Sequence, residues 1–137
     1  MSRVDREDAA RFLDLAKRSC GIKLGPSETL YLYFSATKGA GACECFLKRS
    51  VGGVTMVDPQ RDLFDTIYSD WLERQRKRDS VWTWGWAAFP GRVDSLPELH
   101  LFDDPLSDSE LIGPSHSLKW RHERFGDVNI TYPQAYW

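Results

Sequence analysis

The chain has 137 residues, of which 42% are hydrophobic, 28% charged and 13% aromatic, with a formal net charge of −2. This composition is typical of globular proteins, so it excludes an intrinsically disordered chain, and the length suits one domain spanning residues 1–137. The small net charge excludes the overall positive field that holds nucleic acid. No apolar run is long enough to cross a bilayer, and the polar residues after Met1 do not form a signal peptide. We therefore expect a cytoplasmic protein without a membrane or nucleic-acid partner.

Helical spacing of apolar residues opens the chain and predicts a helix over about residues 4–19. Three short segments with strand-like composition follow, separated by glycine-containing turns: residues 29–34, 42–48 and 54–57. Asp58 and Pro59 then supply a helix N-cap and a proline at the first helical position. An apolar stripe from Leu63 to Leu72 and a basic end complete this second predicted helix.

A run of alternating indoles, Trp82-Thr83-Trp84-Gly85-Trp86, lies in the next expected strand, about residues 81–89. Side chains alternate between the two faces of a strand, which predicts that the three indoles point the same way. Such a face is either core beneath the second helix or an exposed platform for a partner. Gly85 indicates a bulge or a close approach of backbone, and a bulge there would divide the indoles between the two faces.

The segment from Val93 to Leu118 contains no Lys or Arg but six acidic residues. These are Asp94, Glu98, Asp103, Asp104, Asp108 and Glu110. A charge run is usually a solvated surface loop, and we expect an irregular excursion over about residues 90–116, with a strand at 99–102 and a helical turn within 104–112. Leucines are interleaved with the acids, so the segment also suits the docking of a basic partner, whose approach the charges would steer.

The last expected elements are two strands, residues 117–124 and 128–132, joined as a hairpin at Gly126-Asp127. The resulting order of elements is a helix, three strands, a second helix and four further strands. This order predicts an α+β fold: a mostly antiparallel sheet of about five to seven strands, with two main helices packed against it in a single domain.

Three cysteines, an odd number without a disulfide framework, indicate reduced thiols. Cys43 and Cys45 share one face of a predicted strand and could supply two zinc ligands, with Cys20 and a histidine completing a tetrahedral set. Zinc motifs normally contain two paired clusters, so small buried thiols are the better explanation. We therefore predict no metal and no cofactor.

A catalytic interpretation would pair a histidine with a carboxylate as an oriented base, using His100 or His122 with Asp103 or Asp104. No nucleophile motif accompanies these residues. The sequence therefore leans away from an enzyme and toward a binding protein.

No motif identifies a family, and the general character is similar to that of bacterial toxin-neutralising proteins. We predict a non-enzymatic protein-binding domain of the inhibitor or immunity type, which neutralises a basic or toxic partner enzyme through an aromatic and acidic surface. The predicted partner-binding residues are Trp82, Trp84, Trp86, Asp94, Glu98, Asp103, Asp104, Asp108 and Glu110. One alternative is a small-ligand-binding domain or minor enzyme with a Trp-lined pocket. Another is a homodimer that buries the Trp face.

Overall fold

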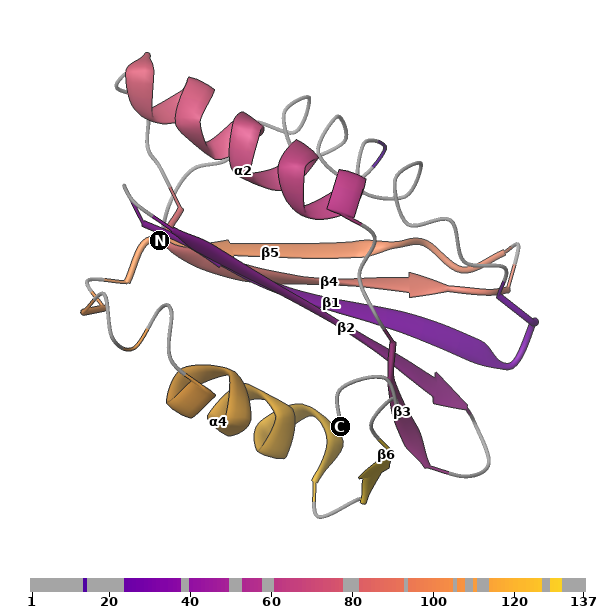
Figure 1. Cartoon of the computed structure of the whole chain (residues 1–137). Coiled ribbons are helices and arrows are strands. Elements are labelled where there is room, and N and C mark those ends of the chain that lie inside the picture. Colours follow the sequence, from indigo (N-terminus) through magenta and orange to yellow (C-terminus); the bar gives the residue numbers. More distant parts are fainter. Residues whose placement is uncertain are drawn as a thin grey trace.

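The computed structural model describes residues 14, 24–37, 40–49, 53–57, 61–77, 82–92, 94–104, 106–107, 110, 114–126 and 129–131. Within them one sheet is built from β1 (Glu28–Ala36), β2 (Gly41–Arg49), β3 (Val54–Val57), β4 (Trp84–Pro90), β5 (Glu98–Phe102) and β6 (Ile130–Thr131). The strand order is β5-β4-β1-β2-β3-β6, and only β3 and β6 pair in parallel. The helices α2 (Arg61–Arg76) and α4 (Pro114–Phe125) lie on opposite faces of this sheet (Figure 1). The predicted α+β fold with a mostly antiparallel sheet is confirmed.

The sheet face beneath α2 holds the first of two cores. Its main members from β1 and α2 are Leu30, Leu32, Phe34, Leu63, Ile67 and Trp71. The three α2 residues recur every four positions and so form one face of the helix, whereas Leu72 lies on the exposed side. The Nε1 of Trp71 donates a hydrogen bond of 2.7 Å to the backbone oxygen of Trp82. This bond ties α2 to the segment that leads into β4.

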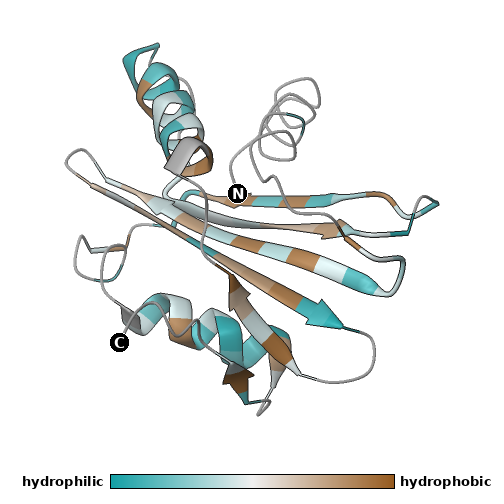
Figure 2. Cartoon of the chain, turned by 45° about the vertical axis from the view of Figure 1, so that its right-hand side comes forward, coloured by the Kyte–Doolittle hydropathy of each residue, from teal (hydrophilic) through white to brown (hydrophobic). Residues whose placement is uncertain are grey.

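The opposite face, which packs against α4, is dominated by aromatic rings. Its rings are Tyr31, Tyr33, Phe46, Trp84, Trp86, Phe102, Trp120 and Phe125. The Trp120 ring centroid lies 5.4 Å from that of Tyr33 and 5.9 Å from that of Phe46. Hydrophobic residues recur along the strands, whereas both helices are coloured mostly hydrophilic (Figure 2). A few large rings therefore supply most of the apolar contact between α4 and the sheet.

The prediction of a strand over residues 117–124 is wrong, because helix α4 occupies this segment. Pro114 takes the first helical position, where its missing N–H has no intrahelical partner to lose. Alternation places Leu118 and Trp120 on one face of a strand. In the helix Trp120 is buried while Leu118 is 49% exposed. The need to cover the aromatic face of the sheet outweighs the local alternation.

The chain leaves α4 at Gly126, whose φ of 71° is the left-handed conformation that favours glycine at a helix end. The Gly126 N–H donates to the carbonyl oxygen of His122 at 2.9 Å. The short strand β6 follows, and it falls inside the predicted strand at 128–132. It pairs in parallel with β3 rather than with a neighbouring strand in a hairpin, so the predicted hairpin is wrong.

The other described elements match the sequence-based predictions, namely the first three strands, the helix after Pro59, the Trp-containing strand and the strand at 99–102. The predicted helix over residues 4–19 lies outside the described residues except for Asp14, which is helical. Most of the helical turn predicted within 104–112 also lies outside them. In the part of the chain that the structure describes, no helix is long and apolar enough to span a membrane.

Candidate functional site

The three indoles of the Trp run do not share one face, so that prediction is wrong at Trp82. Trp82 is 1% exposed and belongs to the core beneath α2, where its ring meets Phe34 edge-on at 5.0 Å. Trp84 and Trp86 lie on the α4 side. The alternation is interrupted at Thr83, where the backbone bends. Thr83 and Trp84 both lie opposite Phe102: the Thr83 N–H donates to the Phe102 carbonyl oxygen, and Trp84 is the strand partner of Phe102. Two residues opposite one is the arrangement of a β-bulge, which redirects the preceding side chain.

Gly85 lies where the backbone of β5 and a side chain of β1 come very close to β4. Of the two explanations that the sequence suggested for this glycine, a bulge and a close approach, the second applies. Its pairing with Phe34 and Leu101 is in regular register. A Cβ on Gly85 would lie 2.6 Å from the carbonyl oxygen of His100 and 2.8 Å from the Phe34 ring. Glycine is therefore required for β5 and β1 to approach β4 this closely.

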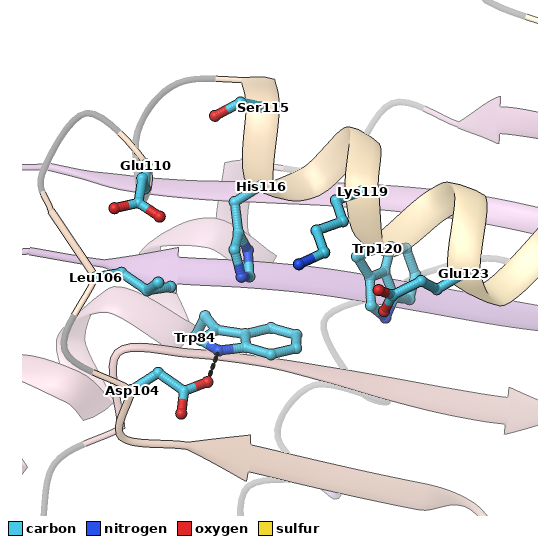
Figure 3. A pocket seen from close by; sticks show the side chains of 9 residues that line it. All are labelled: Trp84, Asp104, Leu106, Glu110, Ser115, His116, Lys119, Trp120 and Glu123. Carbon is cyan, nitrogen blue, oxygen red and sulfur yellow. Dashed lines mark hydrogen bonds between the residues drawn. The ribbon is translucent and has the colours of Figure 1, made fainter.

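A pocket of about 470 Å³ opens between the start of β4, the segment that follows β5, and α4 (Figure 3). We call it the Trp84 pocket, and its lining residues are Trp84, Asp104, Leu106, Glu110, Ser115, His116, Lys119, Trp120 and Glu123. Two indoles and a leucine form its apolar wall. Charged side chains of both signs surround that wall.

Trp84 is held in one orientation by its neighbours on three sides. Its Nε1 donates a hydrogen bond of 2.8 Å to the carboxylate of Asp104. Its ring stacks on Phe102, with centroids 4.3 Å apart and planes 16° from parallel. The imidazole of His116 meets the indole nearly at right angles, with centroids 4.6 Å apart. The ring is thus positioned in advance of any ligand, which lowers the entropic cost of binding.

His116 connects the pocket to the core through Tyr33, whose hydroxyl lies 2.7 Å from the imidazole Nδ1. Tyr33 is 1% exposed, and burial raises the pKa of its phenol, which keeps it protonated. Burial also lowers the pKa of His116 below its ordinary value of 6.5. At neutral pH the pair is therefore an uncharged imidazole hydrogen-bonded to an uncharged phenol.

The charged side chains around the pocket give it a negative balance. Asp104, Glu110 and Glu123 are exposed carboxylates, and Lys119 is an exposed ammonium group. With a neutral imidazole, these three negative charges and one positive charge sum to −2. The arrangement therefore favours a positively charged ligand over an anion.

Glu110 is held at the pocket rim by reciprocal hydrogen bonds with Ser107. The Ser107 hydroxyl donates to the Glu110 carboxylate at 3.0 Å. The Ser107 N–H donates to the same carboxylate oxygen at 3.3 Å, and the Glu110 N–H donates back to the Ser107 hydroxyl oxygen at 3.3 Å. This is the capping box that a serine and a glutamate three residues later form. The bonds from the Ser107 backbone and hydroxyl lower the pKa of Glu110, so the carboxylate stays ionised.

The structure brings together three of the predicted partner-binding residues in the Trp84 pocket, namely Trp84, Asp104 and Glu110. The others described lie outside it. Asp94 pairs with Arg92 at 3.5 Å, and both groups are exposed. Asp103 is exposed directly after β5, and Asp108 lies outside the described residues.

Trp86 lies beside a second group of polar side chains on the same sheet face. Its ring stacks on His100 with centroids 4.3 Å apart, and the guanidinium carbon of Arg124 lies 4.2 Å from the Trp86 centroid. The same imidazole lies 3.7 Å from the carboxylate of Glu98. The predicted base at His100 thus has an aromatic ring and Glu98 as its neighbours.

The pocket residues that sequence reasoning missed come mainly from α4. They are His116, Lys119, Trp120 and Glu123, together with Ser115 and Leu106. The first four recur at positions i, i+3, i+4 and i+7, which is the spacing of one face of a helix. That spacing was the available signal, and the interpretation of the segment as a strand concealed it.

The two described cysteines lie in the first core, as the prediction of small buried thiols requires. Cys45 is buried and Cys43 is half-buried. Cys20 lies outside the described residues. Among the residues that the structure describes, no group of three His, Cys, Asp or Glu side chains could hold a metal ion.

Comparison with protein-family models finds no match to this chain, and no curated protein is significantly similar to it in sequence. The chemistry of the Trp84 pocket and its surroundings therefore carries the functional argument.

Proposed function

We propose that the chain is a non-enzymatic protein-binding domain of the inhibitor or immunity type, which neutralises a basic partner enzyme. The observation that carries this proposal is the Trp84 pocket, where a positioned indole is surrounded by three exposed carboxylates. Tryptophan is among the residues most enriched where binding energy concentrates. An acidic rim around an aromatic centre thus favours a partner with a basic surface.

The acidic field extends beyond the pocket along β5. Glu98 is exposed on this edge strand, Asp103 follows its end, and Asp94 precedes it. Like charges distributed over one edge raise the rate of encounter with an oppositely charged protein. The apolar groups at the centre of the surface would then set how slowly the complex dissociates.

The proposal is tested with the tagged chain as bait in a lysate of its native host. The captured proteins are identified by quantitative mass spectrometry. We expect one stoichiometric basic protein, which the variant Asp103→Lys with Asp104→Lys fails to capture. The matched control, Asp65→Lys with Glu73→Lys, makes the same change of charge on α2, on the far side of the sheet. It should retain the partner. Absence of any stoichiometric protein, or its retention by the first variant, contradicts the proposal.

A second candidate is a small-ligand-binding domain or minor enzyme. The Trp84 pocket, at about 470 Å³, falls in the range of small-molecule sites, which have apolar walls and a few oriented polar groups. The neutral imidazole of His116 in its wall favours this alternative. A metabolite that quenches tryptophan fluorescence in the wild type but not in His116→Ala would support it.

A further inference from the structure

We propose that the Trp84 pocket receives the side chain of an arginine from the partner protein. This inference rests on the proposed function and names the chemistry that the partner must present. Two properties of the pocket lead to it: its charge and the aromatic surface that Trp84 contributes to its wall.

The charge of the pocket selects a cation. Asp104 and Glu110 lie on one side of it and Glu123 on α4 lies on the other, whereas Lys119 is the single positive group in the lining (Figure 3). Because burial lowers the pKa of His116, the imidazole adds no positive charge at neutral pH. A guanidinium group entering between these carboxylates can pair with more than one of them, since it presents five N–H donors in a fixed plane.

The protein already uses guanidinium–aromatic contacts twice on this face. The Arg124 guanidinium carbon lies 4.2 Å from the Trp86 ring centroid, and that of Arg121 lies 4.9 Å from the Phe46 centroid. Within the described residues, no Lys or Arg of the chain itself occupies the corresponding position over Trp84. Tryptophan is the ring that attracts cations most strongly. An arginine from outside would add a third guanidinium–aromatic contact, at the part of Trp84 that lines the pocket.

The test uses N-acetyl-arginine methylamide as the probe, with the full chain labelled with ¹⁵N. We expect saturable shifts of the indole N–H signals of Trp84 and Trp120, which single Trp→Phe variants assign. The variant Glu110→Gln with Glu123→Gln should weaken binding several-fold. Its matched control, Asp65→Asn with Glu73→Gln, removes two carboxylates from α2 on the far side of the sheet and should bind as the wild type does.

Two further probes separate the outcomes. The citrulline analogue has the same shape without the charge and should cause no saturable shift, so equal binding by it overturns the proposal. n-Butylguanidine has the same single positive charge on an alkyl chain without peptide groups. Tighter binding of n-butylguanidine than of the arginine probe would assign the pocket to a diffusible guanidinium compound and overturn a protein arginine. These titrations need no partner protein, so their failure is distinct from a failure to capture one.

Discussion

Tyr33 and His116 are 83 positions apart in the chain, yet the phenol oxygen of one lies 2.7 Å from the Nδ1 of the other. The bond joins the central strand β1 to the first turn of α4. It therefore fixes the helix that supplies one wall of the Trp84 pocket.

Replacement of Tyr33 by Phe removes the hydroxyl and leaves a half-buried imidazole nitrogen without its partner. We expect a loss of about 1–2 kcal/mol in the free energy of unfolding, measured by urea denaturation. Tyr31→Phe is the control, because the Tyr31 hydroxyl makes no hydrogen bond to any described residue. Equal losses in the two variants would contradict a specific role for the Tyr33 hydroxyl.

The pKa of His116 predicts how stability changes with pH. Burial lowers this pKa in the folded protein, so in the window below 6.5 the unfolded state binds more protons than the folded state. Stability is therefore present above pH 6.5 and is lost as the pH falls through that window. Urea midpoints compared at about pH 7.5 and pH 5.5 should fall more for the wild type than for His116→Asn. Both proteins contain the same charged groups around position 116, so these groups affect the two proteins alike. They are Asp104, Glu110, Lys119 and Glu123.

A His116→Asn protein with an unchanged pH dependence would show that another group carries the effect.

Gly85 should tolerate no side chain. In Gly85→Ala the new methyl group would lie 2.6 Å from a backbone oxygen of β5 and 2.8 Å from the Phe34 ring. We expect a loss of about 1–3 kcal/mol in stability, because the strands must move apart to admit it. Gly53→Ala is the control, since among the described residues its methyl group would meet only the Asn129 carbonyl at an ordinary 3.5 Å. Similar midpoints for the two variants in urea would refute the close approach.

We expect Trp82 to contribute mainly to stability and Trp84 mainly to binding. Trp82→Ala empties a fully buried position, and we expect a cost of about 3–5 kcal/mol. Trp84→Phe changes a half-buried ring at the surface, and we expect a stability loss under about 1 kcal/mol. Partner capture and arginine binding should both be lost with Trp84→Phe. Thermal unfolding and the binding assays together check this division, and a reversal of the two effects would contradict it.

Glu44 of β2 and Arg121 of α4 form an ion pair in which both side chains are mostly buried, at 16% and 11% exposure. Removal of one partner leaves the other charge buried, so we expect Glu44→Gln to cost about 3 kcal/mol. The double variant with Arg121→Gln should lose less than the sum of the two single losses. Additive losses measured by urea denaturation would show that the pair is not coupled.

Local patterns in the sequence were sufficient for the central strands and for α2, because each of these elements carries its own periodicity and its own end signals. Periodicity failed at α4, where Leu118, Trp120 and His122 imitate a strand while Pro114 and Gly126 mark a helix. Whether this segment forms a helix or a strand depends on its packing against the aromatic face of the sheet, which the neighbouring residues in the sequence do not reveal.

The candidate site was only partly predictable for the same reason. Trp84, Asp104 and Glu110 were identified by residue type, since indoles and carboxylates are conspicuous in sequence. The division of Trp82 from Trp84 depends on the bend at Thr83, and the contact of Tyr33 with His116 depends on the tertiary fold. Neither leaves a trace in the spacing of nearby residues.

The two edges of the sheet are β5 and β6, and α4 is the element that connects them along the chain. The helix therefore links the two edges along the chain, with the Trp84 pocket beside its first turns and the β3–β6 pair after its last turn. A ligand that tightens the packing at the pocket should slow opening of the β3–β6 pair. Amide hydrogen exchange at Ile130 and Thr131 would then report on occupancy of a pocket at the opposite edge of the molecule.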